Sequence, residues 1–370
     1  MSIRNKFPLL IAAVVMLAGC VDSSGGGGDS AGETAEEPVA NPAVTLQGAI
    51  DQAVDNAIVP AVEGFLAEAQ ALDAAATAFC STLDEASLEA LQDGWRATYE
   101  QWFRLSLYNF GPLNDDIVFP QYTFIDSLRL RGTDYLETVR SEIAADIDSD
   151  RELNAAYFAA KTFQRVGLLA LESAVFETST TEHGTAPGEV IAEYRFQPRK
   201  CAVLQGLSGD LVARASYVEQ GWLVAHKDSD LPYRALFLDG QLDDGTAPLS
   251  QLLIAAQEFL DYLQARRVVV VAAPVAGNTW EAVTATIDEV ELLLSASDET
   301  TGSFIDVMVA TGNQNAVAAV EDSLAQVRQA IADRDADMLE ITLGYLDGNF
   351  KREIPDSLEV ELGINFSDGD

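Results

Sequence analysis

Histidine and cysteine, which supply many catalytic metal ligands, are scarce in this chain of 370 residues. The two histidines, His183 and His226, lie far apart in polar sequence and lack the spacing of a metal-binding pair. We expect both to be solvated rather than catalytic. The HExxH, GxSxG, Walker and dinucleotide-binding motifs are also absent. A histidine-rich zinc or haem site is therefore excluded.

Basic residues are few as well. Lysine and arginine total 22 against 59 aspartates and glutamates, which gives a formal net charge of −37. Nucleic acid is excluded as a natural partner because binding to the phosphate backbone requires a basic surface. Anionic membrane surfaces are disfavoured for the same reason. Multivalent cations and basic partners remain compatible with this charge, and so does a simple adaptation for solubility and salt.

Residues 1–20 have the layout of a lipoprotein export signal. Arg4 and Lys6 form a short positive segment, residues 7–17 are almost entirely apolar, and the sequence LAGC ends at Cys20. Small residues before a cleavage point are typical of signal-peptidase sites, and a cysteine at that point can carry a lipid. The apolar run is shorter than the roughly 20 residues that span a bilayer. We expect cleavage before Cys20 and lipidation of that residue; the alternative is an ordinary signal peptide with an incidental cysteine.

Residues 21–43 are rich in glycine, serine and acidic residues and are predicted to form a flexible tether. Val21 follows the cysteine where aspartate would favour retention in the inner membrane. The prediction is therefore a periplasmic protein, anchored by lipid to the outer membrane. Loss of the signal removes two basic residues and no acidic ones, so the mature chain keeps 20 basic and 59 acidic residues, a net charge of −39.

Helical periodicity in the remaining sequence predicts an all-α fold with two helical-bundle domains in tandem, residues 44–230 and 231–370. Residues 228–248, rich in proline, glycine and aspartate, are interpreted as the connection. The first clear helix is expected between a capping box at residues 82–85 and the NFGP turn at 109–112. Residues 268–271, four valines, are the candidate strand. Further helices are expected at residues 153–176, 198–222, 249–267, 279–296, 316–332 and 335–346.

Glu172 is the most informative carboxylate in the sequence. Its neighbours one helical turn away are apolar, and a buried carboxylate is costly unless it is paired, coordinated or protonated. Gly167, just over one turn earlier, would allow another helix or a ligand to approach closely. Two interpretations remain open: Glu172 belongs to a ligand site, or it is a structural carboxylate satisfied by an arginine. The apolar neighbours are Leu168, Leu169, Val175 and Phe176.

Arg96 is the predicted partner of Glu172 because an up-down bundle could bring the early aromatic helix alongside. Asp93, Arg96 and Glu100 lie at positions i, i+3 and i+7 of that helix. We therefore predict a binding cleft from these three residues together with Glu172 and Gly167. The alternative is a set of exposed ion pairs within the helix, worth roughly 0.2–0.5 kcal/mol each.

Cys80 and Cys201 are predicted to form a disulfide. Cys20 is taken by the lipid, and the remaining even pair would face an oxidising compartment.

Four segments together resemble the imelysin-like proteins, a family classed as metallopeptidases. GWR at residues 94–96, followed by YNFGPL at 108–113, resembles the family's early W-R helix and its F-G-P-L turn. GLLALE at 167–172 resembles its G-x-H-x-x-E motif, and RKCAVL at 199–204 resembles a cysteine-containing helix start. The C-terminal residues, from LG at 362–363 to DGD at 368–370, resemble the usual family ending. The resemblance spans nearly the whole mature chain.

This resemblance implies an all-helical body of two bundle-like domains with a cleft near their interface, and an exported protein associated with iron acquisition. Leu169 stands where the motif has histidine, and leucine neither binds a metal nor transfers a proton. The His–Glu metal pair implied by the family is therefore broken in this chain.

The resulting hypothesis is a non-enzymatic periplasmic lipoprotein, a binding or accessory protein linked to iron uptake. Its expected partners are the membrane, through the lipid anchor, and envelope iron-uptake proteins. Its candidate ligand is iron or another divalent cation. Two alternatives remain open: an imelysin-type metallopeptidase that uses Glu172 and other acids, and a structural envelope lipoprotein without a ligand.

Overall fold

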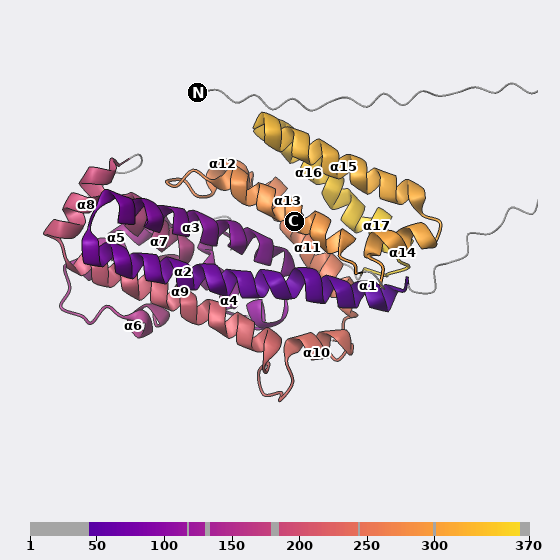
Figure 1. Ribbon diagram of the computed structural model, residues 1–370, viewed down its shortest axis with the longest axis horizontal. Coiled ribbons are helices and arrows are strands. Elements are labelled where there is room, and N and C mark those ends of the chain that lie inside the picture. Colours follow the sequence, from indigo (N-terminus) through magenta and orange to yellow (C-terminus); the bar gives the residue numbers. More distant parts are fainter. Residues whose placement is uncertain are drawn as a thin grey trace, which may run out of the picture. The chain divides into compact units, whose positions relative to one another are not determined.

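Helices joined by turns and loops make up the part of the chain that the computed structural model describes, and no strand occurs in that part (Figure 1). The described residues are 44–116, 118–129, 134–178, 185–242, 245–298 and 301–362. The all-α prediction is confirmed. The predicted signal peptide and tether lie outside these ranges, as does His183.

Long helices alternate with short ones and with single turns. The long helices are α2 (Val59–Thr82), α3 (Glu85–Leu105), α5 (Leu136–Ile147), α7 (Gly167–Phe176), α8 (Pro187–Phe196), α9 (Arg199–Leu223), α11 (Pro248–Ala265), α13 (Thr279–Ser295), α15 (Gln314–Asp333) and α16 (Ala336–Lys351). The short helices are α1 (Leu46–Ala53), α4 (Gln121–Ile125), α6 (Ala155–Ala159), α10 (Tyr233–Leu238), α12 (Val268–Val271), α14 (Phe304–Ala310) and α17 (Glu353–Ser357). A π-helical segment, Val54–Ile58, joins α1 to α2.

The start of α3 differs slightly from the prediction. Helix α2 continues to Thr82, and Leu83 then adopts a left-handed conformation, with φ of 52°. The capping residue of α3 is Asp84, whose side chain accepts a hydrogen bond from the Ser87 amide at 2.9 Å. The capping box thus lies two residues later than expected, and it turns the chain sharply from α2 into α3.

The predicted helix over residues 153–176 is wrong as one continuous element. It is divided into α6, a 3-10 turn at Phe163–Arg165, and α7. Gly167 begins α7 with φ of +79°, and a Cβ atom there would lie 2.3 Å from the backbone oxygen of Phe124. Gly167 therefore admits the backbone of α4, as expected for a close helix approach. The four valines of α12 form a short helix and not a strand.

A disulfide joins Cys80, near the end of α2, to Cys201, in the first turn of α9. This is the pairing predicted from the sequence. It fastens two helices that pack along each other in the N-terminal half of the body.

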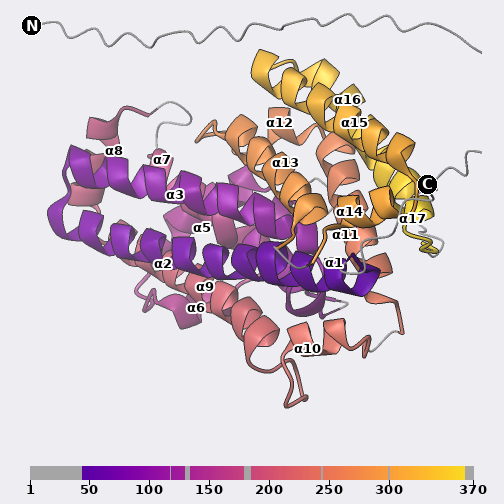
Figure 2. The same ribbon diagram turned by 45° about the vertical axis from the view of Figure 1, so that its right-hand side comes forward.

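Helices α2, α3, α7 and α9 form one group, and α11, α13, α15 and α16 form another (Figure 1, Figure 2). The groups are not separate domains, since α13 packs against α3 and the buried apolar side chains of both groups form one continuous core. Phe103 of α3 contacts Phe259 of α11 with ring centroids 5.8 Å apart. The predicted division near residue 230 is corrected accordingly, since the described residues between 44 and 362 belong to one compact unit.

Among the described helices, none combines the length and apolar character that crossing a bilayer would require.

Candidate functional site

Helix α7 is buried along almost its whole length. Glu172 is 1% exposed, and every other residue of the helix except Leu169 is classed as buried. The predicted burial of Glu172 is confirmed. A carboxylate in this position has exchanged water for protein groups, so its hydrogen-bond partners determine its chemistry.

The partners of Glu172 are two backbone amides from the loop between α12 and α13. The amides of Val275 and Ala276 donate to Oε1 at 2.9 Å and 2.7 Å. Left-handed residues at both ends of the loop, Ala273 (φ +42°) and Gly277 (φ +72°), turn the chain around these amides. Successive amides of this kind form a concave site that binds a carboxylate.

The predicted Glu172–Arg96 pair is wrong. Arg96 donates to Asp93 at 2.8 Å, and these side chains are 36% and 67% exposed. The Arg96 guanidinium also lies 5.0 Å from the centre of the Phe176 ring, which is a cation–π geometry. The alternative considered from the sequence, an exposed ion pair within one helix, is what the structure shows.

The candidate cleft residues therefore separate into two sets. Glu172 and Gly167 lie on buried α7, whereas Asp93, Arg96 and Glu100 lie on α3 and do not line the cavity at Glu172. Glu100 is half-buried, and burial together with the nearby carboxylate of Glu281 raises its pKa.

Glu172 lines a small cavity between α3, α7 and the loop that follows α12. The cavity offers about 20 Å³ to the centre of a water molecule, which is room for about one water. Its wall is formed by Trp95, Tyr99, Asp126, Leu128, Asp134, Leu168, Leu169, Glu172, Val271, Ala273 and Pro274.

Burial raises the pKa of Glu172 to about 7, although the two loop amides oppose the shift. The carboxylates of Glu177 and Asp126 add to the rise. Asp126 accepts hydrogen bonds from the Trp102 indole and the Leu128 amide, each at 3.1 Å. Burial, reinforced by Asp126, also raises the pKa of Tyr99 well above its usual value. The cavity therefore favours the neutral forms of Glu172 and Tyr99.

Sequence reasoning missed the amide loop and Asp126. The loop sequence, AAPVAG at residues 272–277, has no charged or hydrogen-bonding side chain that would mark it as a carboxylate partner. Asp126 lies between two short turns and has no helical periodicity to place it. His226 is a further correction, because it is 6% exposed and packs its ring against Tyr233 at 5.0 Å rather than lying in solvent.

The residues at this cavity do not fit a catalytic metal. Leu169 contributes hydrocarbon where the related motif has histidine, and Glu172 Oε1 already accepts two amide hydrogen bonds. Throughout the described ranges, no group of three or more His, Cys, Asp or Glu side chains is placed to hold a metal ion. Zinc in hydrolases is usually held by three protein ligands beside an open position.

Comparison with known proteins identifies one family and several solved structures of similar fold, of which two are described here. A family model described as Imelysin (peptidase M75) matches residues 58–356. A solved imelysin-like protein from Psychrobacter arcticum has a TM-score of 0.62 at 17% identity, over 86% of this chain and 96% of that one. A Parabacteroides distasonis protein described as an iron-regulated protein A precursor has a TM-score of 0.54 at 13% identity, over 88% and 97%. These identities establish a shared fold only. No curated protein matches the chain.

Proposed function

The chain belongs to the imelysin family, and we propose that it is an exported, lipid-anchored member that acts as a non-catalytic binding or accessory protein in iron acquisition. One observation carries the proposal. The carboxylate of the motif, Glu172, is fastened by the amides of Val275 and Ala276 inside a cavity that has Leu169 in its wall.

This arrangement lacks what metallopeptidase chemistry needs. A catalytic zinc requires several protein ligands and an open position for water and substrate. The motif supplies Glu172 without a histidine, and its cavity has room for about one water molecule, which excludes a peptide. Glu172 is better explained as a structural group that holds the loop at residues 272–277 against α7.

Two further observations support the envelope and iron parts of the proposal. The sequence LAGC at residues 17–20 follows a short apolar run, as in lipoprotein signals. The similar structure from Parabacteroides distasonis is described as an iron-regulated protein A precursor. An accessory role beside envelope iron-uptake proteins agrees with both.

The proposal is tested by deleting the gene and measuring growth with and without an iron chelator. Deletion should slow growth only when iron is limiting, and the wild-type gene should restore it. Purified protein should cleave peptide substrates no faster than a Glu172→Gln variant. Peptide cleavage that this substitution abolishes would instead support the metallopeptidase alternative. If the deletion strain grows as well as the wild type when iron is limiting, the protein has no role in iron acquisition, and a structural envelope role is favoured.

A further inference from the structure

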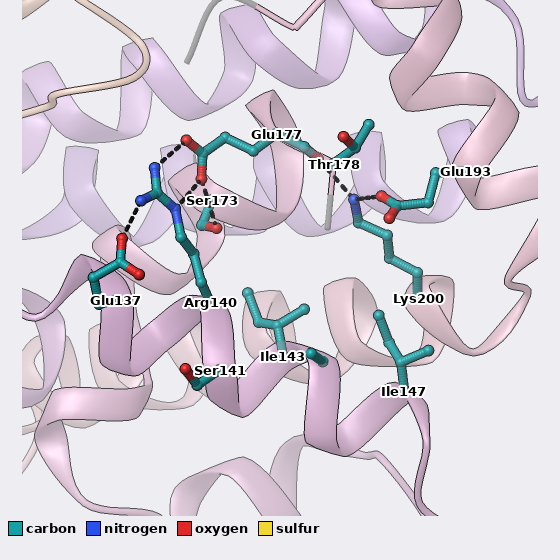
Figure 3. Close-up of a pocket in the computed structure, with 11 residues that line it drawn as sticks. Glu137, Arg140, Ser141, Ile143, Ile147, Ser173, Glu177, Thr178, Glu193 and Lys200 are labelled. Atoms are coloured by element: carbon teal, nitrogen blue, oxygen red, sulfur yellow. Dashed lines mark hydrogen bonds and ion pairs between the residues drawn. The ribbon is translucent and has the colours of Figure 1, made fainter. Parts of the chain in front are cut away.

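A second and larger cavity lies at the C-terminal end of α7. It shares no lining residue with the cavity at Glu172 and has a volume of about 250 Å³. Side chains from α5, α7, α8 and the first turn of α9 surround it (Figure 3). The family motif that contains Glu172 does not account for this cavity.

On one side of the cavity, partly buried Arg140 pairs with buried Glu177 and with exposed Glu137. Arg140 donates to Glu177 through Nε at 3.0 Å and Nη2 at 2.6 Å, and the Ser173 hydroxyl donates to the same carboxylate at 3.0 Å. The side chains of Arg140 and Glu177 are 15% and 2% exposed. This two-pronged geometry fixes both groups in place.

The opposite side holds a buried lysine–glutamate pair. Lys200 donates to the carboxylate of Glu193 and, at 2.8 Å, to the backbone oxygen of Glu177. The side chains of Lys200 and Glu193 are 3% and 9% exposed. Burial lowers the pKa of Lys200, and Glu193 opposes that shift by stabilising the ammonium.

An apolar surface completes the cavity. Ile143, Ala144 and Ile147 of α5 line it, and the two isoleucines project toward the space between the ion pairs (Figure 3). A molecule in this space would therefore meet hydrocarbon on one side and charges of both signs on the others.

We propose that this cavity binds a small zwitterion, an α-amino acid with an aliphatic side chain. Three carboxylates and two cations of the described residues line the cavity. Glu137 is 77% exposed, so water screens its charge. The charges of the other two glutamates, Arg140 and Lys200 balance, so a ligand with a net charge would leave a charge uncompensated inside the cavity, which is strongly disfavoured. A zwitterion has no net charge and can place its ammonium near one glutamate and its carboxylate near one cation. The aliphatic side chain contacts Ile143 and Ile147. The volume is near the lower end for ligand sites, which suits an amino acid better than a peptide.

The test is calorimetric titration of the purified protein with L-leucine, L-isoleucine and L-valine. At least one should bind and should raise the unfolding temperature, because a ligand of the folded state stabilises it. Two analogues of leucine that carry a single charge, 4-methylpentanoate and 3-methylbutylamine, should each bind roughly tenfold more weakly or worse. Equal binding of either analogue would overturn the zwitterion assignment, and so would the absence of binding by all three amino acids at millimolar concentration.

A matched pair of variants tests the location. Ala144 and Ala145 are both exposed on α5, but only Ala144 lines the cavity. Ala144→Trp should fill the space and abolish binding, whereas Ala145→Trp adds the same side chain to the same helix and should leave binding intact. Binding that survives Ala144→Trp would overturn the site. Because this cavity is independent of Glu172, the result does not depend on the proposed function.

Discussion

At the scale of the residue, the pKa of Glu172 depends on its burial and on the two backbone amides that replace water as its hydrogen-bond donors. Burial favours the protonated acid, while the amides of Val275 and Ala276 favour the anion. Burial is the larger effect, so the pKa rises to about 7. Arg96, the partner predicted from the sequence, lies on α3 and pairs with Asp93 instead.

Stability near neutral pH should depend on Glu172. Because its pKa is about 7 in the folded protein and 4.5 when unperturbed, folding favours the protonated form. Its stabilising effect is full below about pH 4.5 and is lost as the pH rises through about 7, a change on the order of 3 kcal/mol. Glu172→Gln keeps an acceptor for the amides and does not ionise. Urea unfolding should therefore show the variant gaining stability relative to wild type between pH 5 and pH 8.

The control for general charge removal is Glu89→Gln on the exposed face of α3, which should show no such pH-dependent gain. If Glu172→Gln were instead less stable by several kcal/mol at every pH, Glu172 would be a charge paired with a cation. That result would contradict the amide-bound carboxylate.

Gly167→Ala should destabilise the protein severely. The added Cβ would lie 2.3 Å from Phe124 O and 2.5 Å from Ile125 O, in a residue with φ of +79°. Both backbone segments would have to move, at a cost of about 3 kcal/mol or more. Gly188→Ala, in α8, is the matched control because a Cβ there meets no atom within 4 Å. Helix propensity should make the control neutral or more stable by up to about 1 kcal/mol. Equal effects of both substitutions in thermal unfolding would refute this account of Gly167.

At the scale of the element, the positions of the long amphipathic helices could be predicted from the sequence, whereas the breaks between helices could not. Residues 279–296 and 316–332 were predicted almost as α13 and α15 form, because their apolar positions repeat with the helical period. The break before α7 depends on the contact of Gly167 with α4, which local sequence does not encode. The loop at residues 272–277 binds Glu172 through backbone amides, so its side chains give no sign of this role in the sequence.

The disulfide between α2 and α9 should contribute strongly to stability. Cys80 and Cys201 are separated by 121 residues, for which loop-closure entropy gives up to about 4–5 kcal/mol. Replacing both cysteines with serine should lower the urea midpoint, and dithiothreitol should lower the midpoint of wild type while leaving that of the double variant unchanged. Labelling of both thiols in the native, non-reduced protein would contradict the bond.

At the scale of the whole molecule, two groups of helices share one core. Tyr108 donates to Glu289 of α13 at 2.7 Å, and Arg104 of α3 lies 3.4 Å from Asp288 of α13. Helical periodicity predicted the all-α class because it reports which face of each helix is apolar. It does not report which helix covers that face, so the contact of α3 with α13 and the single compact unit were not predictable.

Export and lipidation should depend on Cys20. Cys20→Ala removes the thiol that would carry the lipid, so the variant should leave the membrane fraction or remain unprocessed. Fractionation and intact-mass analysis of wild type and variant provide the test, with Cys80→Ser and Cys201→Ser together as a control that leaves the signal intact. A variant that stays in the membrane with the wild-type lipid mass would refute the anchor.

Glu172 holds a loop and does not bind a catalytic metal. Equilibrium dialysis of the purified protein against Fe²⁺ or Zn²⁺, followed by elemental analysis, distinguishes these two roles. Because Glu172 already accepts two amide hydrogen bonds, wild type and Glu172→Gln should retain the same small amount of metal. Stoichiometric metal in wild type that Glu172→Gln removes would show that Glu172 is a metal ligand.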